Sequence, residues 1–204
     1  MVHVVYALSD TIDDLFLSAS AGDSRAQFLL GFHFKQYKGD IYSAIHWYKE
    51  AIKQNNHNAM YALAAIYYSE PSPIKNLSLA FKFMGAAADY GNPKALYFLA
   101  LSHLKGEHVL EDFKMAVRYI ELAALKDHIQ AIYTLAQFYD RGYLVNADKM
   151  KACALYRIAK DHGHKLAESR CTYLLFSMSK TEIDQSNAYS QIDHIVVETM
   201  PDAA

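Results

Sequence analysis

The sequence predicts an all-α fold, a solenoid of stacked antiparallel helix pairs with a period of 36 residues. Three series of alanines share this period, and glycines and capping residues recur in the same register. The first series has spacings of 33, 36, 36 and 36, and the other two are spaced by 36 throughout. The series are Ala26, Ala59, Ala95, Ala131 and Ala167; Ala44, Ala80, Ala116, Ala152 and Ala188; and Ala51, Ala87, Ala123 and Ala159. A period of this size is typical of a stacked array of supersecondary units.

Each unit is predicted to contain two helices joined by a loop. The third unit reads NPKALYFLALSHLKG, then EHVLED, then FKMAVRYIELAALKD. Gly106 can end the first helix, because glycine adopts the left-handed conformation of a helix C-terminus without steric cost. Asp112 precedes the second helix and can accept hydrogen bonds from its free N–H groups. Ala116 and Ala123, seven residues apart, place small side chains on one face, so neighbouring helices can approach closely.

We expect one repeat array over residues 1–198, followed by a tail at 199–204. Residues 9–22 form the second helix of an incomplete leading unit, and Ala188 places a fifth second helix at about Asp184 to Val197. Terminal repeats depart from the pattern because one of their faces meets water. The expected repeats cover 23–56, 57–91, 92–127 and 128–163, with a degenerate C-terminal repeat at 164–198.

Composition excludes several classes of protein. Of 204 residues, 52% are apolar and 21% are charged, which argues against disorder. No apolar run reaches the roughly 20 residues that a membrane helix needs. The formal net charge of −2 and the lack of a basic stripe argue against a nucleic-acid partner.

Cysteine usage and the first residues bear on the compartment. Two cysteines, Cys153 and Cys171, do not form a disulfide framework, so a reducing compartment is expected, although a bridge between them stays open. The start MVHVVYALSDTIDD has no lysine or arginine before its short apolar patch, which makes it a poor secretory signal. We therefore expect a cytoplasmic location, with export that needs no signal as an alternative.

No motif indicates catalysis, a cofactor or a metal. The pairs His103/His108 and His162/His164 lack the cysteine or carboxylate companions of a metal site. Serine and lysine recur three residues apart at Ser72 to Lys75 and at Ser177 to Lys180, as in serine acyl-enzymes, but the companion motifs are missing. We expect His103 to be a buried, hydrogen-bonded histidine and both cysteines to be small core residues.

The repeats resemble a known family. The segment Ala26-Gln27-Phe28-Leu29-Leu30-Gly31, with Phe34, resembles the first-helix signature of Sel-one-like repeats, which are related to tetratricopeptide repeats. The segment Ala44 to Ala51, with Trp47-Tyr48-Lys49, resembles the second-helix signature, and the later repeats match again. The resemblance covers about residues 10–198. It implies a right-handed α-superhelix whose first helices line a concave face, in a protein that holds other proteins as an adaptor.

A partner-binding surface is predicted on this concave face. Phe28, Tyr61, Tyr97 and Tyr133 each follow an anchor alanine by two residues; they form either an intramolecular ladder or a row facing a bound peptide. Positions six and nine after each anchor are unusually apolar for a solvated face, and basic residues flank them at the rim. The predicted partner-binding residues are Phe28, Phe32, Lys35, Tyr61, Tyr68, Tyr97, Leu101, Leu104, Lys105, Tyr133, Gln137, Arg141 and Tyr173.

The functional hypothesis is a non-enzymatic scaffold that binds a protein segment in its groove. An inhibitor or immunity protein that neutralises a toxin is the alternative, and a serine hydrolase is the alternative from another class. A homodimer through apolar end helices is a further hypothesis, resting on Leu15-Phe16-Leu17 at one end and on Ile192 with Ile195-Val196-Val197 at the other.

Overall fold

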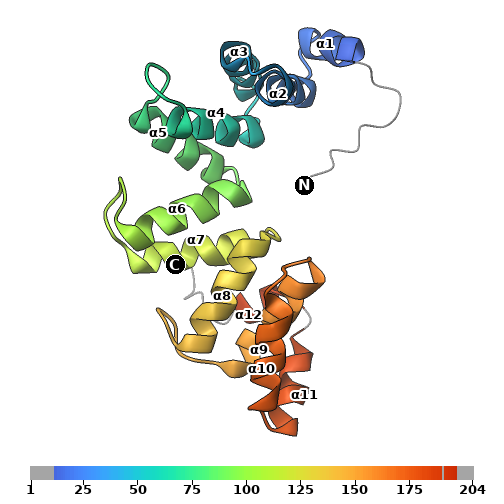
Figure 1. The fold of residues 1–204 in the computed structure, drawn as a ribbon, viewed down its shortest axis with the longest axis vertical. Coiled ribbons are helices and arrows are strands. Elements are labelled where there is room, and N and C mark those ends of the chain that lie inside the picture. The colour runs from blue at the N-terminus through green and yellow to red at the C-terminus, as the bar shows by residue number, and fades with distance from the viewer. Residues whose placement is uncertain (1–11, 190, 197–204) are drawn as a thin grey trace. The chain divides into compact units, whose positions relative to one another are not determined.

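The computed structural model describes residues 12–189 and 191–196 (Figure 1). The predicted tail at 199–204, the start of the leading helix at 9–11, and Val197 lie outside the described residues. The chain divides into two compact units, one ending at Asn92 and the other beginning at Pro93. Each unit is described by itself below.

The regular secondary structure in the described part of both units consists of helices, which confirms the predicted all-α class. The first unit holds α1 (Ile12–Ser20), α2 (Ser24–His33), the π-helix η1 (Phe34–Lys38), α3 (Ile41–Ile52), α4 (His57–Ser69) and α5 (Leu77–Asp89). The second unit holds α6 (Pro93–Lys105), α7 (Phe113–Ala124), α8 (Ile129–Arg141), α9 (Lys149–Asp161), α10 (Ala167–Phe176), α11 (Lys180–Ala188) and α12 (Asp193–Val196). Consecutive helices pack as pairs: α2 with α3, α4 with α5, α6 with α7, and α8 with α9.

The periodic alanines form the contact surfaces of these pairs. With one exception, every alanine of the three series is buried, and none of the buried ones is more than 6% exposed. The exception is Ala188, which is exposed at the end of α11. Because a methyl group occupies so little space, the helix axes come close, and the larger side chains Tyr48, Leu63, Ile120 and Tyr156 fill the remaining volume of their units.

The loop within each repeat is closed by one recurring hydrogen bond. The backbone N–H of the residue that caps the second helix donates to a carbonyl nine residues earlier in the first helix. The pairs are Asn76 with Tyr67 at 2.9 Å, Asp112 with His103 at 3.2 Å, and Asp148 with Tyr139 at 3.0 Å. In the first repeat, which is shorter, Asp40 donates to Phe34 at 3.1 Å, only six residues back. The π-helix η1 and the left-handed Gly39 (φ 66°) make this shorter connection.

The predicted capping residues occupy their expected places. Asp40, Asn76, Asp112 and Asp148 each accept a hydrogen bond from a backbone N–H in the first turn of the following second helix. Gly142 ends α8 in the left-handed region with φ 64°. These capping contacts fix where the second helices begin and where α8 ends.

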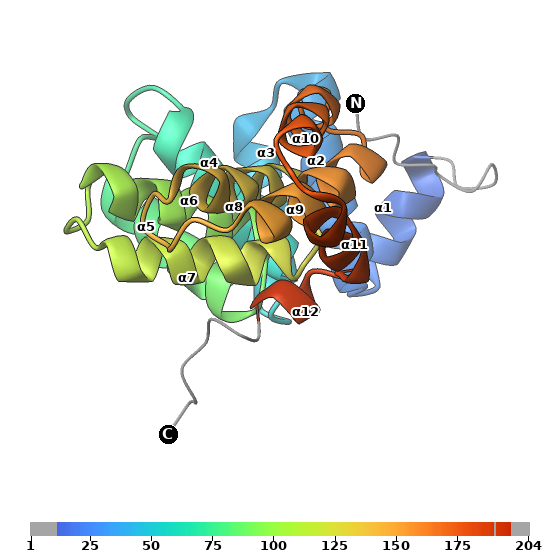
Figure 2. The same ribbon diagram turned by 90° about the horizontal axis from the view of Figure 1, so that it is seen from below.

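The C-terminal repeat differs from the prediction. The prediction of a helix from about Asp184 to Val197 is wrong, because α11 begins at Lys180 and ends at Ala188. A reciprocal capping box between Ser179 and Glu182 starts this helix early, and α12 follows as a separate short turn. Both α10 and α11 pack against α9 (Figure 2).

The two apolar ends behave differently. Ile192, Ile195 and Val196 are buried within the chain, so the expectation that they are available for stacking two arrays is wrong. At the other end, Leu17 is exposed on α1, whereas the ring of Phe16 makes an edge contact with Trp47 at 5.5 Å.

Two helical glycines give a sharp test of the packing. A Cβ added at Gly31 in α2 would lie 2.7 Å from the ring of the buried Tyr48 and 3.2 Å from the carbonyl oxygen of Ala44. We expect Gly31→Ala to lower the free energy of unfolding by roughly 1–3 kcal/mol, because the α2–α3 contact becomes overpacked. Urea unfolding followed by circular dichroism measures the change.

Gly85 in α5 is the matched control, since no atom outside its own helix backbone and its chain neighbours lies within 4 Å of the added Cβ. Gly85→Ala should raise stability by about 0.5–1 kcal/mol through helix propensity alone. Equal effects of the two substitutions would contradict the close α2–α3 contact.

Candidate functional site

The four predicted ladder residues are half-buried, and Phe28, Tyr97 and Tyr133 each contact a ring within their own unit. Phe28 packs beside Tyr48 at 5.9 Å, Tyr97 beside His128 at 4.8 Å, and Tyr133 on His164 at 3.9 Å. Burial raises the pKa of Tyr61. Tyr97 and Tyr133 therefore pack against the start of the following repeat, whereas Phe28 packs within its own repeat. Contact of these rings with a partner stays a prediction.

The other predicted positions differ in exposure. In the first unit, Phe32 and Tyr68 contact the rings of Tyr37 and Phe81, and the Lys35 ammonium lies 3.8 Å from the Glu70 carboxylate. In the second unit, Leu101, Leu104 and Gln137 are half-buried, while Lys105, Arg141 and Tyr173 are exposed. A single continuous groove through both units stays a prediction.

Helix α10 and the residue before it present three exposed apolar side chains, one of which is at a predicted position. Tyr173 is 67% exposed, Phe176 is 89% exposed, and Leu166 at the helix start is 61% exposed. The spacing of seven and three residues places them within one sector of the helix surface. We call Leu166, Tyr173 and Phe176 the α10 stripe. Only Tyr173 of the three was among the predicted binding residues.

A polar cluster fixes the helix under this stripe. The Arg170 guanidinium donates to the Asp140 carboxylate at 2.6 Å and lies 5.8 Å from the centre of the Tyr173 ring. The Tyr156 hydroxyl donates to the same carboxylate oxygen at 3.1 Å. Burial raises the pKa of Tyr156 to about 12, and hydrogen bonds with Tyr156 and Asp140 raise the pKa of Arg170. Asp140 in α8 thereby ties the first helix of one repeat to that of the next.

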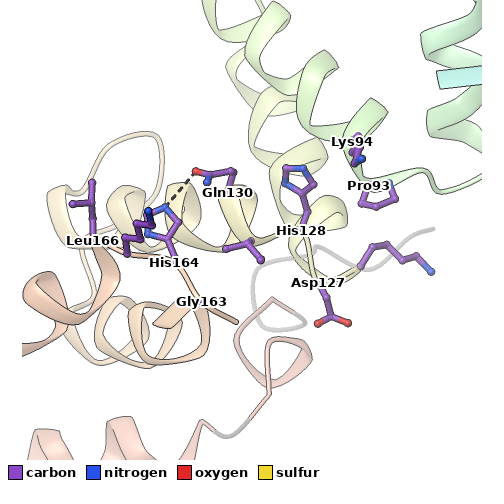
Figure 3. Close-up of a pocket in the computed structure, with 11 residues that line it drawn as sticks. Pro93, Lys94, Asp127, His128, Gln130, Gly163, His164 and Leu166 are labelled. Carbon is purple, nitrogen blue, oxygen red and sulfur yellow. Dashed lines mark hydrogen bonds between the residues drawn. The ribbon is translucent and has the colours of Figure 1, made fainter. Parts of the chain in front are cut away.

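Sequence reasoning missed a groove at the turns between repeats of the second unit (Figure 3). We call it the turn groove; its volume is about 860 Å³. Its lining comes from the start of α6, the α7–α8 turn, and the α9–α10 turn. The lining residues are Pro93, Lys94, Lys126, Asp127, His128, Ile129, Gln130, Gly163, His164, Lys165 and Leu166. The available signal was the presence of a lysine within three residues of the start of each of the first helices α6, α8 and α10.

Two histidines occupy corresponding places in the turn groove. The Nδ1 atom of His128 accepts a hydrogen bond from the N–H of Ala131 at 3.3 Å and so caps α8. The ring of His164 stacks on Tyr133, and its Nε2 atom lies 3.3 Å from the Gln130 side-chain oxygen. Burial lowers the pKa of both residues, and for His128 the neighbouring Lys94 adds to the effect. Both rings are therefore neutral at pH 7.

The two cysteines are free thiols that lie side by side. Their sulfur atoms are 3.4 Å apart, with Cys153 buried in α9 and Cys171 half-buried in α10. A hydrogen bond from the Cys171 thiol lowers the pKa of Cys153 to about 6, and the pKa of Cys171 is raised in turn. The arrangement confirms that Cys153 is a core residue and shows Cys171 at the core edge.

The structure also shows the surroundings of the other motifs considered from the sequence. Within residues 12–189 and 191–196, no group of three or more His, Cys, Asp or Glu side chains is placed to hold a metal ion. The Ser177 hydroxyl donates to the carbonyl of Leu174 at 2.9 Å. His103 is half-buried rather than buried; its ring stacks on Tyr119 at 5.8 Å, and its Nδ1 atom donates to the Leu110 carbonyl at 3.0 Å. None of the helices in the described part has the length and apolar character to cross a bilayer.

The repeats can be compared with known proteins at this point. The family model of the Sel1 repeat matches residues 24–56, 57–92, 93–128 and 129–164. The chain belongs to the Sel1 repeat family. The resemblance predicted from the sequence is thereby confirmed, and a Sel1 repeat scaffold is a fold typical of protein–protein interaction. No curated protein sequence matches this Sel1 repeat chain.

Solved structures of Sel1-like proteins share the fold. A Sel1 repeat protein from Oxalobacter formigenes is 26% identical with a TM-score of 0.72, over 80% of this chain and 48% of that one. A protective antigen of uropathogenic Escherichia coli is 20% identical with a TM-score of 0.58, over 95% and 52% of the two chains. An immunity protein from Pseudomonas aeruginosa is 20% identical with a TM-score of 0.60, over 92% and 73%. The chain thus spans about half the length of the first two proteins.

The Asp140 cluster predicts a difference between two carboxylates. Asp140→Ala should lower the free energy of unfolding by about 1–3 kcal/mol, because the buried Tyr156 hydroxyl and the Arg170 guanidinium both lose their acceptor. Glu50→Ala removes a more exposed ion pair with Lys53 and should cost much less, because water screens that pair. Thermal unfolding of the two variants measures the difference; comparable losses would contradict the structural role of Asp140.

The raised pKa of Tyr156 predicts a loss of stability in alkali. In the unfolded chain tyrosine ionises near pH 10, whereas in the folded chain Tyr156 ionises near pH 12. Its contribution is therefore complete below pH 10 and is lost as the pH rises toward 12. Urea unfolding from pH 9 to 11.5 should show a smaller alkaline loss in Tyr156→Phe than in the native chain; parallel pH profiles would contradict the shift.

Proposed function

We propose that this Sel1 repeat protein is a non-enzymatic adaptor that binds a segment of a partner protein. The observation that carries the proposal is the exposure of Tyr173 and Phe176 on α10. Family membership supports the general class, because the repeat is generally a protein-interaction fold. The proposed binding surface is the α10 stripe.

The α10 stripe has the properties of a binding surface rather than of a solvated helix face. Burying a large apolar side chain contributes roughly 1.5–3 kcal/mol, so leaving both rings in water forgoes a substantial stabilisation. Aromatic residues and arginine are also the types that dominate binding energy at interfaces. The bond from Arg170 to Asp140 holds the cation near Tyr173, which reduces the ordering that a partner must impose.

The predicted concave-face residues have a supporting role in this proposal. Arg141 and Lys105 are exposed cations of the second unit and can pair with acids at the rim of the interface. Tyr97 and Tyr133 stabilise the stacking of repeats and keep part of their surface accessible. A partner would therefore meet a surface whose rings are already ordered.

Toxin neutralisation is a narrower form of the same proposal. The structural neighbour from Pseudomonas aeruginosa is an immunity protein, and its identity of 20% supports only a shared fold. An immunity protein and an adaptor differ in the stoichiometry and the affinity of partner binding. An immunity role requires one-to-one binding that abolishes the partner's activity, whereas an adaptor leaves that activity intact.

Comparative affinity capture tests the proposal. The native chain and the double variant Tyr173→Ser/Phe176→Ser are immobilised, and proteins from a lysate of the source organism are quantified by mass spectrometry. Loss of these anchors should weaken partner binding by about tenfold or more, since each tenfold step corresponds to roughly 1.4 kcal/mol. The partner is then purified, and its dissociation constant is measured for both chains.

The control variant is Tyr42→Ser/Leu110→Ser, because these side chains are 68% and 88% exposed and so match Tyr173 and Phe176. It should bind the partner as the native chain does. The proposal fails if both double variants keep every captured protein, or if both lose the same ones.

A further inference from the structure

We propose that the turn groove binds an acidic segment of the partner protein, whose carboxylates contact Lys126 and Lys165. This inference rests on the proposed function and names the chemistry of the segment. Aspartate and glutamate side chains are the natural ligands of these lysines, because a carboxylate accepts charge-assisted hydrogen bonds from ammonium groups.

The charge of the turn groove is opposite in sign to that of the whole chain. Three lysines line it, Lys94 at the start of α6, Lys126 in the α7–α8 turn and Lys165 in the α9–α10 turn, and Asp127 is the only acid among its described lining residues. The Asp127 carboxylate lies 3.8 Å from the His162 ring. Glu168, the nearest acid along α10, pairs with Lys160 at 3.0 Å. The lining therefore carries a positive excess in a protein whose formal net charge is −2.

The groove also offers apolar contacts beside the cations. Pro93, Ile129 and Leu166 are among the lining residues, and Leu166 is also the first member of the α10 stripe. A chain whose acidic residues contact Lys126 and Lys165 can continue along α10 and bury apolar residues against Tyr173 and Phe176. The expected segment thus combines an acidic residue with apolar residues a few positions away.

The stacking of the rings favours a peptide over a nucleic acid. Single-stranded nucleic acids bind on aromatic faces that are open to the bases. The aromatic rings among the described lining residues are those of His128 and His164. One face of His164 stacks on Tyr133 at 3.9 Å, and His128 packs beside Tyr97 at 4.8 Å. The volume of about 860 Å³ lies within the usual range of ligand clefts, roughly 300–1,000 Å³.

Selection from a random peptide library tests the inference. Dodecapeptides displayed on phage are selected against the full chain, and enriched peptides are synthesised with a fluorescent label for polarisation measurements. We expect enriched peptides to carry aspartate or glutamate near an aromatic or aliphatic residue. Their affinity should fall by about tenfold or more in Lys126→Gln/Lys165→Gln and with added salt, because the contact is electrostatic.

The matched control removes the same charge elsewhere in the second unit. Lys114→Gln/Lys149→Gln alters two exposed lysines near the starts of α7 and α9, outside the groove lining, and should leave peptide affinity unchanged. Equal losses in the two lysine variants would mean a general charge effect and would overturn the inference. Preferential binding of a labelled single-stranded oligonucleotide that depends on Lys126 and Lys165 would overturn it too.

Failure of this inference is distinguishable from failure of the proposed function. Neutral peptides that depend on Tyr173 and Phe176 but not on the lysines would overturn the acidic-segment inference and leave the adaptor proposal intact. A library that yields no binder would overturn the acidic-segment inference, while the adaptor proposal stands or falls with the comparative capture.

Discussion

Close approach of helices at alanine is the constraint on which the rest of the structure depends. At Ala44, Ala80, Ala116 and Ala152 the second helix of each repeat meets its neighbours with a methyl group that is at most 1% exposed. Because the helix axes lie close together, the backbone N–H of the residue before the second helix can reach a carbonyl of the first helix. The same hydrogen bond therefore closes the loops that end at Asn76, Asp112 and Asp148. Packing and loop closure are consequences of one spacing in the sequence.

The repeat register could be predicted from the sequence because small residues and caps act locally. An alanine at a helix contact, an aspartate before a helix and a glycine after one each have a physical reason to stand where they do. The same logic failed at the C-terminus. There Ala188 continues the period but lies exposed at the end of α11, because the capping box of Ser179 and Glu182 sets the helix start instead. A periodic residue thus predicts a buried contact only where a further repeat packs against it.

The candidate site was less predictable than the fold. Tyr173 could be identified because its position in the repeat demands no apolar residue, so its aromatic ring stood out. The turn groove could not, because its lysines lie in turns where cations are ordinary and only the structure brings them around one volume. The ring contacts of His128 and His164 with the ladder tyrosines likewise depend on distances between successive repeats, which the sequence pattern does not give.

Two histidines that precede first helices of the second unit take part in packing beside the turn groove. His128 caps α8 and packs beside Tyr97, whereas His164, one period later, stacks on Tyr133 while α10 begins at Ala167 without a side-chain cap. Since both rings are held by these contacts and stay neutral, the charge of the turn groove comes from its lysines and from Asp127. In the turn groove, the rings that stack the repeats are therefore separate from the lysines Lys126 and Lys165. Substitution of the lysines can change binding without disturbing the array.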